Sequence, residues 1–292
     1  MNTFTIKDLE NLSGIKAHTI RIWEQRYSFL KPQRTDTNIR FYSNDELKTV
    51  LNIALLNKYG FKISHIDKMQ QREIQEKLLS LVDANAIQER IVNELVQEMV
   101  DLNSEKLEKI LAGYISSKGM ERTVVQIIFP FLEKIGLLWL TGHIIPAQER
   151  LVSNIIRQKL IVAIDAANPR LKVDTTILLF LPEGEHHELG LLYITYLLKN
   201  KGIKIIYLGA NVPVNDVAYV VNEKKPDIIL AHLTATSDSF KFDKFLEAVN
   251  AKFLQTPTVI SGLLTQSYKK ALPPGITFKK SLSEVMEFLT GF

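Results

Sequence analysis

The hydrophobic period of the sequence changes once, at Asn168-Pro169, and this change constrains the fold more than any other feature. From about residue 72 up to that point, apolar residues recur three and four positions apart, which is typical of amphipathic helices. Beyond it, short continuous apolar runs such as residues 175–181 alternate with helical segments. Because buried parallel strands have this appearance, residues 169–292 are predicted to form a doubly wound parallel sheet of the Rossmann-like type.

The expected elements of this α/β region follow from the same pattern. Strands are expected over residues 175–181, 204–209, 227–233, 256–262 and 276–278. Helices are expected over residues 187–201, 213–224 and 240–251, and from residue 281 onward. Pro213 suits the start of its helix, because proline is favoured in a first helical turn.

Residues 73–168 are predicted to form a central four-helix bundle. The expected helices of this region cover residues 73–81, 85–101, 104–117, 120–140 and 146–167. The connections between them are short, which favours neighbouring helices packed in a bundle. A chain of 292 residues is long enough for two domains, and three small ones also fit.

Residues 1–72 are predicted to form a winged helix-turn-helix. Helices are expected over residues 6–12, 16–27 and from 43 to about 60, with a small hairpin over residues 29–42. Thr5 can cap the first helix, and Ser13-Gly14 supplies a tight turn before the second. A helix, a tight turn and a second helix that carries hydrogen-bond donors is the arrangement of many DNA-binding domains.

The positive charge of the chain is concentrated in this first quarter. The net charge is +4, yet residues 1–72 contain twelve Lys and Arg against seven Asp and Glu, whereas the remainder contains 24 against 25. An excess of cations in one region is expected of a polyanion-binding module attached to a part with another role. This asymmetry independently favours DNA binding by residues 1–72.

The N-terminal block resembles the MerR family of winged-helix regulators over roughly residues 3–70. The motif Gly14-Ile15-Lys16-x-x-Thr19-Ile20-Arg21-x-Trp23-Glu24-x-Arg26-Tyr27 matches the recognition helix of that family, and Pro32-x-Arg34-x5-Arg40-x-Tyr42 matches its wing. A recognition helix needs short polar and cationic side chains for the major groove, and a wing needs donors for phosphates and sugars. The predicted DNA-binding residues are Lys16, Thr19, Arg21, Arg34, Arg40 and Tyr42. Ile20 and Trp23 are expected in the core.

A second motif, Glu185-x-His187-x-x-Gly190, follows the first strand of the α/β region. Ligands of open α/β sheets bind beyond the carboxyl ends of the strands, so a site is expected in this loop. A carboxylate two residues before an imidazole can hold one ring nitrogen and leave the other for a metal.

This motif resembles the Asp-x-His-x-x-Gly signature of cobalamin-binding domains. The resemblance implies that His187 is the lower cobalt ligand, that Glu185 orients it and that Gly190 gives room to the nucleotide tail of the cofactor. Thr234 stands where the family has a tail-contacting Ser, and Gly262 stands where it has a glycine pair, one of which is Ser261 here.

The helical block carries a third motif, Trp139-x9-Glu149, which resembles the cap of photosensory adenosylcobalamin regulators of the CarH/LitR type. The resemblance implies adenosylcobalamin as cofactor, with Trp139 and Glu149 against its adenosyl group, light as a release signal and a dimer or tetramer as the assembly. Arg150 departs from that family, which has at this position a His that ligates cobalt after light. A guanidinium stays protonated and cannot ligate cobalt. His143 and His186 are conceivable substitutes.

The predicted function is a DNA-binding transcriptional regulator, not an enzyme, that senses adenosylcobalamin. Two alternatives remain open: a corrinoid methyl carrier of a methyltransferase system, and a MerR-type regulator whose cobalamin-like domain binds another ligand or a protein. The chain has no cysteine, no signal-type N-terminus and no uncharged run as long as a membrane span, so a cytoplasmic location without a membrane partner is expected.

Overall fold

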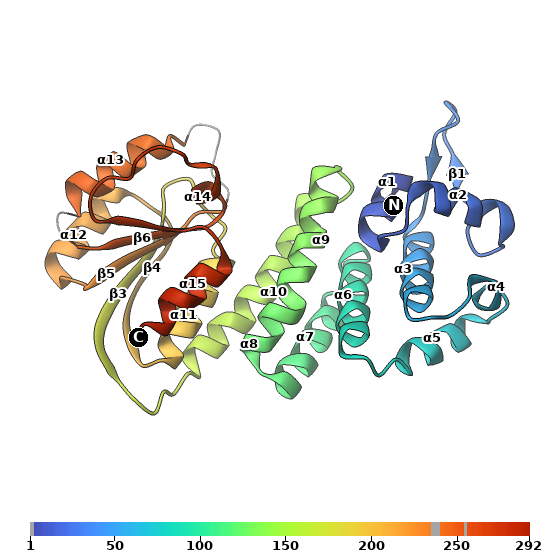
Figure 1. The fold of residues 1–292 in the computed structure, drawn as a ribbon, viewed down its shortest axis with the longest axis horizontal. Coiled ribbons are helices and arrows are strands. Elements are labelled where there is room, and N and C mark those ends of the chain that lie inside the picture. Colours follow the sequence, from blue (N-terminus) through green and yellow to red (C-terminus); the bar gives the residue numbers. More distant parts are fainter. Residues whose placement is uncertain (1–2, 235–239, 254–255) are drawn as a thin grey trace. The chain divides into compact units, whose positions relative to one another are not determined.

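A computed structural model describes residues 3–234, 240–253 and 256–292 (Figure 1). The chain divides into two compact units, Met1–Ile156 and Arg157–Phe292. The first unit contains the predicted winged helix-turn-helix and most of the predicted bundle, and the second contains the α/β region. The division into three domains at residues 72 and 168 stays a prediction.

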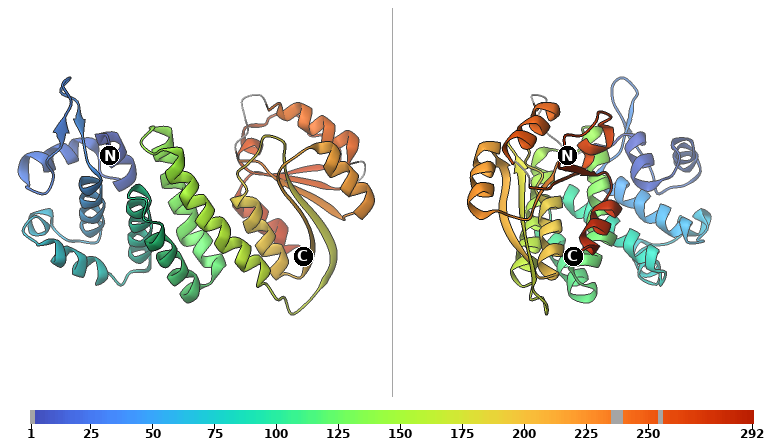
Figure 2. Two further views of the ribbon diagram at one scale, coloured as in Figure 1. Left: turned by 180° about the vertical axis from the view of Figure 1, so that it is seen from behind. Right: turned by 60° about the vertical axis from the view of Figure 1, so that its left-hand side comes forward.

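The first part of unit one has the order expected of a winged helix-turn-helix. Its elements are α1 (Ile6–Ser13), α2 (Ala17–Arg26), β1 (Gln33–Arg34), β2 (Arg40–Phe41), α3 (Asn44–Lys58) and α4 (Ile63–Ile66). Thr5 and Ser43 begin α1 and α3 through reciprocal capping boxes with Asp8 and Glu46. Gly14 ends α1 with a φ of 74°, a conformation that glycine adopts without strain. The short antiparallel pair β1–β2 forms the wing, which extends beyond the neighbouring helices (Figure 2).

The rest of unit one is helical. Its elements are α5 (Gln71–Leu79), α6 (Ala84–Val100), α7 (Ser104–Lys118), α8 (Met120–Thr123), the π-helical turn η1 (Val124–Ile128), α9 (Phe129–Leu140) and α10 (Pro146–Asp165), whose last residues belong to unit two. The helix predicted over 120–140 is present, but it contains the π-turn. Pro130 explains this turn, because it has no N–H to donate to the carbonyl of Gln126 and interrupts the regular ladder there.

The continuous helical stretch Met120–Leu140 is long and apolar enough to span a membrane, judged by length and composition alone. In the structure, Phe131 and Leu138 of this stretch are buried, and the stretch packs against α6 and α1. Lys134 Nζ donates to Asn93 Oδ1 at 2.7 Å and to the carbonyl of Leu12 at 2.9 Å. Burial lowers the pKa of Lys134 to about 8. The stretch therefore has the contacts of a packed bundle helix.

Unit two is a parallel sheet of five strands in the order β4-β3-β5-β6-β7. The strands are β3 (Val173–Pro182), β4 (Ile203–Val212), β5 (Ile228–His232), β6 (Thr258–Ser261) and β7 (Ile276–Lys279). The helices are α11 (Leu189–Asn200), α12 (Val214–Lys224), α13 (Phe242–Lys252), α14 (Leu263–Ser267) and α15 (Leu282–Thr290). Helices cover both faces of the sheet, with α12 and α13 on one side and α11 and α15 on the other (Figure 1). The predicted doubly wound architecture is therefore confirmed.

Strand β3 lies at the centre of this topology. Residues 177–181 are fully buried, because helices cover both faces of the sheet. The strand pairs with β4 on one side and with β5 on the other, so the winding direction reverses at β3. Open α/β sheets bind ligands at such a reversal, beyond the carboxyl ends of the strands. The loop between β3 and α11 therefore occupies the position that favours a binding site.

Candidate functional site

Glu185 is the centre of the loop after β3. Its side chain is fully buried. Oε1 lies 2.7 Å from His187 Nδ1 and accepts the backbone N–H of His187 at 2.8 Å. Oε2 accepts the backbone N–H of Thr234, beyond the end of β5, at 2.9 Å. The carboxylate thus fixes the His187 loop and joins the ends of β3 and β5.

The contact with Glu185 fixes the tautomer of His187. The carboxylate accepts the hydrogen bond, so Nδ1 of His187 carries the proton and the lone pair of the neutral imidazole lies on Nε2. The side chain is 58% exposed. Among the described residues, no group of three or more His, Asp or Glu side chains could hold a bare metal ion. A single oriented imidazole instead fits a metal that receives most of its ligands from a macrocycle.

A second histidine, His232, is packed at the same edge of the sheet, at the end of β5. A side chain at Gly190 would overlap the imidazole of His232. His232 Nδ1 is 2.9 Å from Ser261 Oγ, and the two residues are paired in register between β5 and β6. Burial lowers the pKa of His232 to about 4, so this imidazole is neutral at pH 7. Sequence reasoning missed His232, although it falls at the end of an expected strand.

The two remaining predicted residues of this domain lie beside that edge. Gly262 has a φ of 101°, and a side chain there would overlap the carbonyl of Leu233, so the position requires glycine. Thr234 contributes its backbone N–H to Glu185. The structure thus brings together Glu185, His187 and Thr234 by hydrogen bonds.

Glu188 forms a separate network next to the loop. Its Oε2 is 3.1 Å from Arg157 Nε, and its Oε1 accepts the hydroxyl of Tyr207 at 2.7 Å. Burial and the neighbouring carboxylate raise the pKa of Tyr207. The three side chains line one end of an otherwise largely apolar cavity of about 620 Å³ beside β4. No local sequence pattern indicated this network, because its members are far apart in the chain.

The predicted cap residues lie in unit one, whereas His187 lies in unit two. Trp139 on α9 is 50% exposed. Glu149 on α10 accepts the hydroxyl of Ser153 at 2.6 Å, and Arg150 is exposed. Trp139 therefore has free surface of the kind that a ligand could cover. The roles of Trp139, Glu149 and Arg150 at a cofactor stay predictions.

The two conceivable substitutes for a cap histidine differ in their surroundings. His143 lies between α9 and α10, and its Nδ1 is 3.2 Å from Oδ2 of the buried Asp8 on α1. Its ring also lies 6.4 Å from that of Phe4. His186 is exposed beside His187. His143 thus contacts Asp8 on the first helix of the winged domain. His186 has no comparable contact among the described residues.

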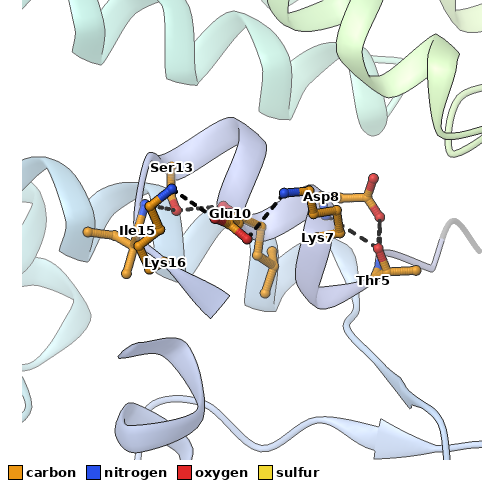
Figure 3. Close-up of polar contacts among 8 residues, drawn as sticks. Thr5, Lys7, Asp8, Glu10, Ser13, Ile15 and Lys16 are labelled. Atoms are coloured by element: carbon orange, nitrogen blue, oxygen red, sulfur yellow. Dashed lines mark hydrogen bonds and ion pairs between the residues drawn. The ribbon is translucent and has the colours of Figure 1, made fainter. Parts of the chain in front are cut away.

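The candidate DNA interface begins with α2. Ile20 and Trp23 are buried, as predicted. Arg21 is exposed on the opposite side of the helix, and Thr19 lies beside His18, with 3.3 Å between their polar atoms. Lys16 is also exposed, and its Nζ is 3.3 Å from Glu10 Oε1 (Figure 3). The cationic side chains of α2 and of the turn before it are thus available to a polyanion.

The wing is tied to α2 by one carboxylate, Glu24. Arg40 Nε donates to Glu24 Oε2 at 2.9 Å, and the Tyr42 hydroxyl donates to Glu24 Oε1 at 2.5 Å. Arg34 is exposed at the wing and donates to Asn38 Oδ1 at 2.7 Å. Tyr42 itself is fully buried, which leaves no surface for a phosphate. We therefore correct its predicted direct contact with DNA to a role in holding Glu24.

Comparison with known proteins defines the class of this chain. Residues 4–73 match the MerR HTH family of regulatory proteins. Residues 91–163 and residues 175–279 match two families of B12-binding domains. The chain thus combines a MerR HTH region with regions of the B12-binding type.

Two transcriptional repressors align with this chain over about nine-tenths of both lengths. The chain is 27% identical to the HTH-type transcriptional repressor CarA of Myxococcus xanthus, over 92% of this chain and 90% of that protein. It is 25% identical to CarH of the same organism, over 91% of each chain. Among solved structures, the monomethylamine corrinoid protein of Methanosarcina barkeri shares the fold, with a TM-score of 0.54, 14% identity and coverage of 69% of this chain and 98% of that one. The chain is homologous to CarA and CarH over nearly its whole length.

Proposed function

We propose that this protein is a transcriptional regulator that binds DNA through residues 1–72 and senses adenosylcobalamin through its B12-binding domains. The observation that carries the proposal is the Glu185–His187 pair at the reversal point of the sheet. A buried carboxylate fixes the imidazole in one tautomer with its lone pair on Nε2, which is how metal-ligating histidines are oriented, and the His187 side chain is 58% exposed. That pair occurs in a chain that also carries a MerR HTH region.

We propose a separate role for each predicted residue of the cobalamin site. His187 would ligate the lower face of cobalt through Nε2, and Glu185 would hold its Nδ1. Gly190 and Gly262 would keep the edge of the sheet free of side chains, and Thr234 would complete the tail site. By the resemblance of the cap motif, Trp139, Glu149 and Arg150 would contribute contacts to the adenosyl group. The bound cofactor would supply a light-sensitive cobalt–carbon bond.

At the DNA, the proposed contacts are Lys16, Thr19, Arg21, Arg34 and Arg40. Their cationic groups would bind phosphates and base edges. One winged helix reads a short site, so a dimer or tetramer that reads paired half-sites is the proposed assembly. The relatives are transcriptional regulators, and accordingly we propose no catalytic residue and a cytoplasmic location.

The test is the visible absorption spectrum of the full chain after reconstitution with adenosylcobalamin in the dark. We expect the spectrum of a histidine-ligated cobalamin for the wild type, and its loss with much of the affinity in His187→Ala. His186→Ala is the matched control, because His186 is an exposed neighbour without a hydrogen bond to Glu185. A wild-type spectrum in His187→Ala, or equal loss in both variants, would contradict the assignment of His187.

A further inference from the structure

Unit one contains a polar cavity that is separate from the proposed DNA and cobalamin residues. The cavity has a volume of about 530 Å³ and is lined by residues of α3, α5 and α6 and by Lys106 of α7. We propose that it binds a small phosphate-bearing metabolite. Sites for small molecules commonly have volumes of about 300–1,000 Å³, so the cavity is large enough.

The charge of the lining points to an anion. Four cations line the cavity, namely Lys48, Arg72, Arg90 and Lys106, against the single carboxylate of Glu94. Two of these cations are paired: Lys106 Nζ is 2.5 Å from Glu98 and 3.6 Å from Glu94, and Arg72 Nε is 3.0 Å from Glu76. Arg90 lies 4.0 Å from Glu94, which is also 3.6 Å from Lys106, so Arg90 and Lys48 are the least compensated cations of the lining.

Arg90 is the more informative of these two. Its guanidinium reaches Glu94 only at 4.0 Å, and its side chain is 26% exposed. Its Nε is buried and has no hydrogen-bond acceptor. A buried donor without an acceptor costs about 1–3 kcal/mol, and more when the group is charged. An anion in the cavity would reach this donor only after the Arg90 side chain turns toward the ligand, and the gain of an acceptor would favour that movement.

Lys48 supplies a second cation from a different helix. It lies on α3 and has no ion pair or hydrogen bond within the described parts of the chain. Arg90 lies on α6, so the two side chains approach the cavity from two elements. Together they offer two cationic groups to a phosphate monoester, whose charge is about −1.5 to −2 at pH 7.

The remaining lining favours a phosphate attached to a polar molecule. Asn52, Gln75 and Gln97 contribute amide groups, which both donate and accept hydrogen bonds. The guanidinium of Arg90 provides the planar fork that binds phosphate oxygens in pairs. Such a set fits a small phosphorylated metabolite with hydroxyl or amide groups. A ligand there would contact both α3 of the winged part and α6 of the bundle.

The test is a calorimetric titration of the full chain with inorganic pyrophosphate at constant ionic strength. We expect saturable binding with one site per chain, weakened at least ten-fold in Arg90→Gln and in Lys48→Gln. Arg72→Gln should have a smaller effect, because Arg72 is already paired with Glu76. Lys109→Gln is the matched control, since Lys109 is an exposed cation of α7 outside the cavity.

Three results would overturn the proposal. The first is the absence of saturable binding beyond the effect of added chloride. The second is equal weakening by Lys109→Gln, which would indicate general surface charge. The third is equally tight binding of succinate, which would exclude phosphate as the recognised group. Lys48→Gln leaves the packed core untouched, so the test remains decisive if Arg90→Gln fails to fold.

Discussion

The wing in unit one and the loop after β3 in unit two both depend on a carboxylate with little exposed surface that holds two partners. Glu24 holds Arg40 and Tyr42, and Glu185 holds His187 and the backbone of Thr234. The difference lies in what remains free. Tyr42 is buried and its hydroxyl donates to Glu24, whereas the side chain of His187 is 58% exposed. The first carboxylate therefore stabilises a scaffold, and the second orients an exposed imidazole, which is the proposed cobalt ligand.

The largest expected effect concerns His232, which is buried at the edge of the sheet where His187 is exposed, and it is an effect on the pH dependence of stability. The folded-state pKa of His232 is lowered to about 4, below its unfolded value of about 6.5, so the unfolded state binds more protons between these values. Stability should therefore be lost as the pH falls from about 6.5 to 4, by up to about 3 kcal/mol. Urea unfolding of the wild type and of His232→Gln across this range measures the difference. Equal pH dependence of the two proteins would contradict the buried, neutral imidazole.

The next prediction concerns the hydrogen bonds by which Glu185 orients His187. Glu185→Gln removes the negative charge beside Nδ1 and one acceptor, so the imidazole loses its fixed orientation. We expect cobalamin affinity to fall about 10–100-fold, the usual cost of losing such a partner. DNA affinity without cofactor should stay unchanged. Unaltered cobalamin affinity would show that Glu185 does not position the ligand.

The corresponding change in the wing is Arg40→Ala. It removes a cation that Glu24 holds through Nε while the terminal nitrogens remain for phosphate. We expect DNA affinity to fall by about 1–3 kcal/mol and its salt dependence to become less steep. Fluorescence anisotropy over a range of salt concentrations measures both quantities. Unchanged affinity and salt slope would remove Arg40 from the interface.

A smaller effect is expected for Tyr42→Phe. The variant loses the hydroxyl that donates to Glu24, and we expect the free energy of unfolding to fall by about 1–2 kcal/mol. DNA affinity should change less than in Arg40→Ala, because Tyr42 is buried. A loss of DNA affinity as large as that of Arg40→Ala, with stability unchanged, would restore Tyr42 as a direct contact.

The smallest expected effect concerns Arg150. We predict that illumination of the wild type with bound adenosylcobalamin gives a spectrum without a second histidine ligand, because a guanidinium cannot ligate cobalt. Arg150→His should give a bis-histidine spectrum after light while cofactor affinity in the dark changes little. A bis-histidine spectrum in the illuminated wild type would instead point to His143 or His186.

Local sequence patterns predicted most elements of the fold, because caps and periodicity act over a few residues. The helices begin and end where expected: α1 begins after Thr5 and ends at Gly14, and α3 begins after Ser43. The five predicted strands are all present. The four-residue α4 and the five-residue α14 were not expected, since helices this short show no period. The π-turn was also missed, although Pro130 is visible in the sequence.

The candidate site was predictable where its chemistry is local. Glu185 and His187 are two residues apart, so their pairing followed from spacing. His232 and Ser261 are 29 residues apart and meet only through the register of β5 and β6. Tyr42 likewise meets Glu24, 18 residues away, only in the folded domain. Such contacts require the topology, which a local pattern does not contain.

The most direct test of the account is whether cobalamin changes DNA binding. DNA that the full chain selects from a random pool would be titrated in the dark, with and without adenosylcobalamin, using the wild type and His187→Ala. We expect at least a ten-fold change of DNA affinity in the wild type and none in the variant. Equal affinity of the wild type with and without the cofactor, once cobalamin is shown to be bound, would contradict it.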